Sequence, residues 1–395
     1  MLSVDEAIAI ILDGARPHGE EMVPLVSVAG RIAAQDIKAR MTQPPFSASA
    51  MDGYAVRFSD MSVGATLRVI GESPAGAPFS GEVGIGEAVR IFTGGVVPTG
   101  ADHVIIQEDV TRDGAQIMVN QSQDQPRNIR GAGIDFENGD LLVAAGTHLH
   151  EMHGSILAAA NIKDVPVYRR PKIALFSNGD ELVEPGAELK PGEIVNSNHY
   201  ALCAMIQRWG GEAYYLGCAP DDENAIRKTF EQARDADLII PVGGASVGDY
   251  DFVKSAFAAA GGGIRFEKIA VRPGKPTWFG KLGAARVVGL PGNPASALVT
   301  AALFVQPLVR HLGGDATAAT FETARLTAAV SANGNRESYL RASAMVTGNG
   351  VAVTPASNQD SSLLMPFASA NVLIRRRVDA PSAEAGEHVE IVWLR

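Results

Sequence analysis

Three loops between residues 237 and 298 carry residue types that can bind an anion. They read DLIIPVGGASVGDYD (237–251), RPGKP (272–276) and LPGNPAS (290–296). Each loop borders an apolar run that is typical of a strand, and two of them continue into a helical pattern. In an open α/β sheet, ligands lie at the strand ends, and helix N-termini there favour phosphate. These loops therefore predict a site for a phosphate-bearing ligand.

The glycine-rich loop combines backbone donors with acids. The amides of Gly243 and Gly244 can approach an anion without interference from a Cβ, and Ser246 adds a hydroxyl donor. Carboxylates beside a phosphate loop commonly hold Mg²⁺, which makes Asp249 and Asp251 metal candidates. Either aspartate could instead cap the helix predicted to follow.

The other two loops supply a helix start and a pair of cations. Asn293 stands where an N-cap belongs and Pro294 where the first helical residue belongs, so we expect first-turn amides to face a ligand. Arg272 and Lys275 suit bidentate and point-charge contacts with an oxyanion, although a lone basic turn is usually solvated surface. The substrate-binding candidates in the LPGNPAS loop are Pro291, Gly292, Asn293, Pro294 and Ser296.

Acids follow two further predicted strands. SNGDEL (177–182) places Glu181 at the end of the first strand of the α/β segment. Asp221 and Asp222 precede a predicted helix, and either could be a site residue or a first-turn acid that favours the helix dipole. In a separate β-rich stretch, Asp52 of SAMDGYAV and Thr93 of FTGGVVPTGAD are weak signals when each is taken alone.

The elements that must position these residues divide the chain of 395 residues into several domains. We expect a helical linker domain at 1–43 with 147–170, an inserted β-rich domain at 44–146, an α/β domain at 171–314 and a C-terminal β domain at 315–395. Strands and helices alternate through the α/β segment, which predicts a parallel sheet covered by helices. Ser3 and Glu6 have the spacing of a capping box.

Composition excludes several classes of function. A net charge of −10 argues against a broad surface for nucleic acid or an anionic membrane. The only two cysteines, Cys203 and Cys218, give no disulfide framework or zinc spacing, which fits a reducing cytoplasm. The eight histidines form no metal motif, and there is no P-loop or strand-linked GxGxxG. The apolar run at 295–309 is too short for a bilayer span and predicts a buried helix.

The ordered strings SAMDGYA, TGGVVPTGAD, SNGDEL, PDD, GGASVGDYD, RPGKP and LPGNPAS resemble the molybdopterin molybdenumtransferase family, to which the C-terminal part of gephyrin is related. The resemblance runs over essentially the whole chain. It implies insertion of molybdate into adenylylated molybdopterin with release of AMP, dependence on Mg²⁺, and an elongated homodimer whose cleft is shared between subunits. It also implies an α/β domain similar to molybdopterin adenylyltransferases, one of which could be a partner, and a small barrel-like C-terminal domain.

The resemblance also assigns roles to individual residues. Asp52, Thr93, Glu181, Asp221, Asp251 and Lys275 would be catalytic; Glu181, Asp249 and Asp251 would lie near the metal; Arg272 and Lys275 would contact molybdate or phosphate. The family more often has Thr at the position of Asn178, so a hydroxyl contact there is in doubt. Two alternatives remain: an adenylyltransferase activity of the α/β domain alone, which would not need the strings around Asp52 and Thr93, and a scaffold without catalysis.

Overall fold

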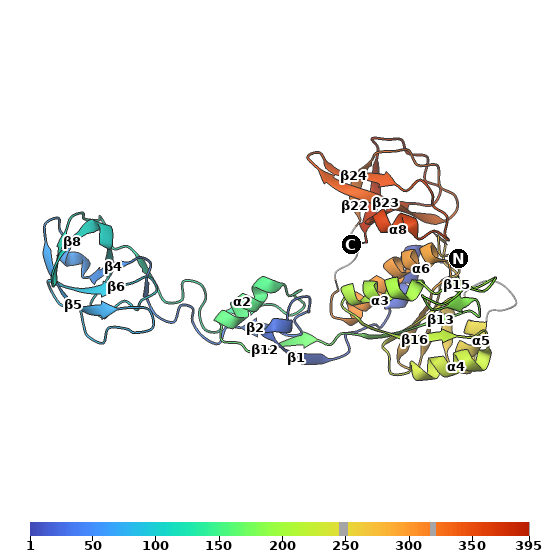
Figure 1. The fold of residues 1–395 in the computed structure, drawn as a ribbon, viewed down its shortest axis with the longest axis horizontal. Coiled ribbons are helices and arrows are strands. Elements are labelled where there is room, and N and C mark those ends of the chain that lie inside the picture. Colours follow the sequence, from blue (N-terminus) through green and yellow to red (C-terminus); the bar gives the residue numbers. More distant parts are fainter. Residues whose placement is uncertain (245–251, 317–320, 395) are drawn as a thin grey trace. The chain divides into compact units, whose positions relative to one another are not determined.

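The computed structural model describes residues 1–244, 252–316 and 321–394. Contacts within it define two compact units (Figure 1). Unit 1 comprises Met1–Glu21, Gly30–Ala34 and Val167–Arg395, and unit 2 comprises Met22–Ala29 and Gln35–Pro166. The four domain boundaries expected from the sequence stay a prediction.

A six-stranded sheet forms the centre of unit 1. Its order is β16 (Glu212–Ala219), β13 (Lys172–Asn178), β17 (Leu238–Val242), β21 (Ala285–Gly289), β20 (Trp278–Leu282) and β18 (Gly263–Phe266). The first four strands are parallel, as predicted, whereas β20 and β18 add an antiparallel edge that the sequence pattern did not indicate. Both are short, and β20 is buried at Trp278 and Phe279 without the alternation that identifies a strand.

Helices cover both faces of this sheet (Figure 1). Alternate residues of β13 and β17 divide between two cores: Ile173 and Ile240 belong to one, and Phe176 and Ile239 to the other. The helices of the first face are α1 (Val4–Leu12), α3 (Asn198–Arg208), α6 (Pro294–Thr300) and α7 (Gln306–Leu312); those of the second are α4 (Glu223–Gln232) and α5 (Phe252–Ala259).

The predicted buried helix is confirmed. The run Pro294–Leu312 contains 19 residues, and 72% of its most apolar window is buried inside the protein. A π-helical segment, η4 (Ala301–Val305), joins α6 to α7 within it. The helix therefore lies in the core of unit 1 against the central sheet.

The first helix also belongs to this core. The predicted capping box is present, because the Glu6 amide donates to Ser3 Oγ at 3.2 Å and the Ser3 amide donates to the Glu6 carboxylate at 2.8 Å. Val4, Ala7 and Ile11 are buried, and α1 packs against η4 and α7.

The C-terminal strands close a five-stranded barrel. Its order is β23 (Glu337–Thr347), β24 (Gly350–Pro355), β22 (Glu322–Leu326), β26 (His388–Trp393) and β25 (Val372–Arg376), with β25 pairing back to β23. The short strand β19 (Val271–Arg272) leaves the α/β region and pairs in parallel with β23. The RPGKP turn therefore starts from a strand attached to the barrel.

Unit 2 is rich in β-structure, as the sequence predicted. Its sheet has the order β7 (His103–Ile106), β4 (Gly53–Val56), β6 (Glu87–Ile91), β5 (Thr66–Ser73), β9 (Gln116–Val119) and β8 (Val110–Asp113). Helix α2 (Glu151–Ala159) confirms the helical pattern after His150. The short elements of unit 2 are η1 (Leu25–Ser27), β2 (Ile37–Lys38), β3 (Ala48–Ser49), η2 (Phe58–Asp60), η3 (Gln107–Asp109), β10 (Ile129–Arg130) and β11 (Leu141–Val143). Two strands, β1 (Glu20–Pro24) and β12 (Asp164–Tyr168), contain residues of both units, and the short elements of unit 1 are β14 (Leu182–Val183), β15 (Ile194–Val195) and α8 (Met365–Ser369).

Candidate functional site

Two of the predicted loops meet where β17 and β21 end. The Gly243 amide donates to the Leu290 carbonyl at 3.1 Å, and a Cβ built on Gly292 would lie 3.7 Å from the Cα of Gly243. A cavity of about 530 Å³ opens beside them, and we call it the glycine cavity. Its walls come from the ends of β13 and β17, the segment before α3 and the LPGNP loop. This is the strand-end position expected of a ligand site.

Only glycine fits at the two central positions of this wall. Gly243 and Gly244 have φ angles of 105° and 60°. A Cβ on Gly243 would lie 2.5 Å from the Asn178 carbonyl oxygen, and one on Gly244 would lie 2.2 Å from a methyl carbon of Val253. The backbone at these two glycines therefore packs directly against its neighbours, and backbone atoms rather than side chains face the cavity.

Asn178 organises the acids behind the cavity. Its buried Nδ2 donates to Asp221 Oδ1 at 2.9 Å and to the Ala219 and Pro220 carbonyls at 3.3 Å. The Asp221 amide in turn donates to Asp180 at 3.1 Å. A side-chain amide, rather than a hydroxyl, therefore makes the contact at this position. Asp222 instead caps α4, because its carboxylate accepts from the Ala225 amide at 2.8 Å.

The RPGKP turn lies at a second, larger cavity of about 810 Å³, which we call the basic cavity. Arg272, Lys275, Arg336 and Arg376 line it. Arg272 and Lys275 are exposed and form no ion pair within the described part of the chain. Gly274, at φ 106°, lets the turn press against α6, since a Cβ there would lie 2.1 Å from Thr300. Four positive side chains and one carboxylate, Asp360, surround this hollow, so the net positive charge creates a field that favours an anion.

One segment of the barrel walls both cavities. Residues 355–357 and 359–361 contribute to the basic cavity, and Ser362 contributes to the glycine cavity. Ser361 contacts the start of α6: its carbonyl accepts from the Ala295 amide at 3.0 Å, and its hydroxyl accepts from Asn293 Nδ2 at 3.2 Å. The expectation that the first-turn amides face a ligand is thus wrong for Ala295, whose donor this segment occupies.

Arg341 of β23 holds that segment from within the barrel. The side chain is 1% exposed and donates to the carbonyls of Leu363 and Asp360 at 3.0 Å and of Asn358 at 3.5 Å. Its Nε donates to the Gln359 side chain at 3.3 Å. Burial lowers the pKa of Arg341 from its ordinary value. The wall shared by the cavities is therefore anchored through one buried guanidinium.

Most of the predicted and described site residues of unit 1 distribute over the two cavities, whereas Asp221 lines neither of them. The glycine cavity is lined by Glu181, Gly243, Gly244, Pro291, Gly292, Asn293 and Pro294. The basic cavity is lined by Arg272, Lys275 and Ser296. Pro276 lines both cavities, so they adjoin at the RPGKP turn. Ser246, Asp249 and Asp251 lie outside the described residues. Groups of three or more His, Cys, Asp or Glu that could hold a metal do not occur among the residues that are described.

In unit 2, Asp52 and Thr93 contact each other. Asp52 Oδ1 accepts from both the amide and the hydroxyl of Thr93 at 2.8 Å. These bonds lower the pKa of Asp52 from its ordinary value, chiefly through the backbone donor. Arg90 lies nearby, stacked 5.0 Å from the Tyr54 ring centroid and donating to the Gly53 carbonyl at 3.0 Å. Two strings that are weak signals when taken alone thus form one local arrangement.

Several residues of the site escaped the sequence analysis. Asn198, Arg341, Ser361 and Ser362 were not among the candidates. The string VNSNHY (195–200) offered a signal, since three consecutive polar residues stand at the start of a helix there. Arg341 gave none, because a single arginine in a strand is indistinguishable from a solvated one until its burial is known.

Comparisons with known proteins cover nearly the whole chain. A model of the MoeA N-terminal region (domain I and II) matches residues 2–161, a probable molybdopterin binding domain matches 174–311, and the MoeA C-terminal region (domain IV) matches 323–394. A molybdopterin molybdenumtransferase of Haemophilus influenzae is 42% identical over 80% of this chain and 78% of its own length. One from Nostoc is 38% identical over 81% and 76%.

A solved structure agrees with these matches. The molybdopterin biosynthesis MoeA protein from Pyrococcus horikoshii superimposes with a TM-score of 0.88 at 34% identity, covering 100% of this chain and 99% of that one. The predicted fold class is confirmed: several domains, among them a helix-covered α/β sheet, a β-rich region and a small C-terminal barrel.

Proposed function

Because this chain belongs to the molybdopterin molybdenumtransferase family, a family of enzymes, we propose that it inserts molybdate into adenylylated molybdopterin and releases AMP. The observation that carries the proposal is the pair of adjoining cavities: one lined by glycine backbone, the other by four cations, with Pro276 in the wall of each. A reaction that joins an oxyanion to a phosphate-linked heterocycle needs two such compartments side by side.

The basic cavity suits the oxyanion. Molybdate is a tetrahedral dianion, and Arg272 and Lys275 have no competing carboxylate partner in the described residues. Arginine offers paired donors and lysine a point charge, so together they can bind the ion and neutralise charge that develops when the phosphoanhydride bond breaks. The glycine cavity suits the adenylylated pterin, because the backbone amide of Gly244 can donate a hydrogen bond to a phosphate group there, whereas the amide of Gly243, contrary to the expectation from the sequence, is already bonded to the Leu290 carbonyl.

We also propose that the reaction depends on Mg²⁺, and that Glu181 is one of its ligands. The carboxylate lies over Gly179, where a Cβ would come within 2.3 Å of it, and the residue lines the glycine cavity. Mg²⁺ usually takes one or two carboxylates together with water and substrate phosphates. Glu181 would hold it with Asp249 or Asp251, which the sequence places in the adjoining loop. The ion would offset negative charge on the phosphates.

The proposal extends to the setting in which the enzyme works. We propose a cytoplasmic homodimer that receives adenylylated molybdopterin from a separate adenylyltransferase. Asp52 and Thr93 keep their proposed catalytic role in it. The Asp52 carboxylate is charged at neutral pH, and the bonds from Thr93 that lower its pKa favour this charged form, which suits contact with a cation or a hydroxyl donor.

The test uses purified protein with adenylylated molybdopterin, molybdate and Mg²⁺, and measures AMP release and cofactor formation. Lys275→Ala and Asp52→Ala should fold normally and lose insertion. Lys228→Ala, an exposed lysine of α4, is the matched control and should retain full activity. Unchanged turnover in both site variants would refute the residue assignment. Formation of adenylylated molybdopterin from molybdopterin and ATP by the wild-type chain would favour the adenylyltransferase alternative.

A further inference from the structure

Arg90 lies between the two strings that contain Asp52 and Thr93. It is near the end of β6, three positions before Thr93. Strand pairing places it opposite Tyr54 of β4, and Tyr54 stands two positions after Asp52. Side chains at paired positions of neighbouring strands contact each other and the adjacent backbone. Arg90 is therefore within reach of both partners of the Asp52–Thr93 contact.

The guanidinium of Arg90 joins β4 to the start of η3. Its Nη1 donates at 3.0 Å to the carbonyl of Gly53, the residue after Asp52, and its Nη2 donates to Gln107 Oε1 at 2.8 Å. Gln107 in turn holds Asp52 directly, since its amide donates to the Asp52 carbonyl at 3.1 Å. The backbone on both sides of the Asp52 side chain is thus tied into one set of bonds that includes Arg90.

Two aromatic rings and an unpaired charge set Arg90 apart from a surface arginine. The guanidinium lies over the rings of Tyr54 and Phe92, 5.0 Å and 4.9 Å from their centroids, and such contacts favour a planar cation. Arg90 forms no ion pair with any described residue. The two bonds from Thr93 chiefly lower the pKa of Asp52, and the charge of Arg90 adds to this effect.

We propose that Arg90 is a positioning residue, which keeps Asp52 and Thr93 in contact by joining β4, β6 and η3. The inference rests on the proposed function in that Asp52 is taken to be catalytic. Arg90 acts through the Gly53 carbonyl on one side and through its own strand, which continues to Thr93, on the other. A lysine would keep the charge but would offer a single ammonium in place of the planar fork that makes both bonds.

The experiment removes the fork from the full chain and measures the contact directly. In Arg90→Gln, the Thr93 amide, which donates to Asp52, should exchange with solvent roughly tenfold faster, as expected for the loss of one bond of about 1.4 kcal/mol. The pKa of Asp52, followed by carbon NMR, should rise. Turnover at saturating substrate should fall with it, because the carboxylate is no longer held in place. Arg112→Gln is the control, since Arg112 of β8 also donates to a backbone carbonyl, that of Gly114 at 3.2 Å, and its loss should leave all three readouts unchanged.

A second variant separates the fork from the charge. Arg90→Lys keeps the positive charge beside the rings, so the Thr93 amide should still exchange faster than in the wild type, while the pKa of Asp52 should rise less than in Arg90→Gln. Wild-type exchange of Thr93 in both variants would overturn the inference. A loss of stability spread over unit 2, with the pKa of Asp52 unchanged, would show a merely structural role and would overturn it too. If both readouts change as expected but the wild-type chain inserts no molybdenum, the inference stands and the proposed function is refuted.

Discussion

The strongest structural prediction concerns Arg341, whose replacement should loosen the wall between the two cavities. Arg341→Met keeps an unbranched stem in the side chain but removes the guanidinium, and with it four hydrogen bonds to the segment 358–363. At about 1.5 kcal/mol for each bond from a charged donor, these bonds contribute roughly 6 kcal/mol. Relief of the buried charge returns several kcal/mol, so we expect a net loss of about 3 kcal/mol.

The loss should appear as local opening, because the segment is bonded to the start of α6 mainly through Ser361. Hydrogen exchange followed by mass spectrometry measures that opening directly. A loss of about 3 kcal/mol corresponds to roughly 100-fold faster exchange in peptides covering 356–367, and the Ala295 amide should lose protection with them.

Arg377→Met is the matched control, since Arg377 is an exposed arginine paired with Glu390 at 2.9 Å, beyond the end of β25. Exposed pairs are worth about 0–1 kcal/mol, so exchange around the cavities should stay as in the wild type. Protection of 356–367 that is equal in Arg341→Met and the wild type would refute the reasoning. Faster exchange spread evenly over the whole of unit 1 would also contradict it.

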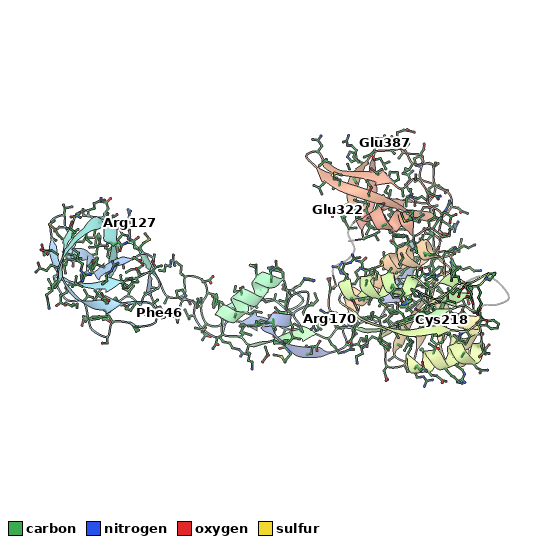
Figure 2. The ribbon with its side chains drawn as sticks, in the orientation of Figure 1. Phe46, Arg127, Arg170, Cys218, Glu322 and Glu387 are labelled. Atoms are coloured by element: carbon green, nitrogen blue, oxygen red, sulfur yellow. The ribbon has the colours of Figure 1, made fainter. Side chains whose placement is uncertain are left out.

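Three further predictions concern titration and capping. Thr93→Val removes one of two donors to Asp52, so the pKa of Asp52 should rise toward its ordinary value, as carbon NMR titration would show. The charged carboxylate stabilises the fold at neutral pH, and this stabilisation is lost on acidification. In the variant it should be lost at a higher pH than in the wild type. The residue Cys218 is exposed as a whole, but its sulfur lies against the chain, 3.5 Å from the Gly179 carbonyl oxygen; this desolvation and nearby acids raise the pKa of Cys218 to about 11. Its alkylation by iodoacetamide should therefore accelerate up to that pH, and an inflection below pH 9 would contradict this. Figure 2 labels Cys218, which is exposed near the carboxyl end of β16. Asp222→Ala should lower the free energy of unfolding by about 1 kcal/mol in denaturant titration, because the Ala225 amide at the start of α4 loses its side-chain acceptor. Asp222→Asn keeps an acceptor and should lower it less.

Periodicity predicted the central α/β order because its strands are long enough to show a pattern. β13 and β17 are buried on both faces and read as continuous apolar runs, and the helices between them are amphipathic. The antiparallel edge was missed because β20 has five residues and mixes Gly280 and Lys281 with aromatic residues. Such a string has no period that distinguishes a strand from a loop.

The sequence predicted the glycines of the site but not the residues that hold its walls in place. Gly243 and Gly244 are visible in the sequence because few other residues tolerate their backbone geometry. Lys275 and Asn293 line two different, adjoining cavities because the barrel segment 355–362 packs between them. The packing of that segment depends on contacts between residues more than 60 positions apart. Sequence spacing carries no information on contacts of that range.

The position of α1 bears on how the chain is synthesised. Its buried face, which includes Val4, Ala7 and Ile11, packs against η4 and α7, about 300 residues later in the sequence. At ribosomal rates of about 5–20 residues per second, those partners emerge roughly 15–60 seconds after α1. The apolar face of this helix must therefore remain without its partners during that interval, so we expect it to be a binding site for a chaperone on the nascent chain.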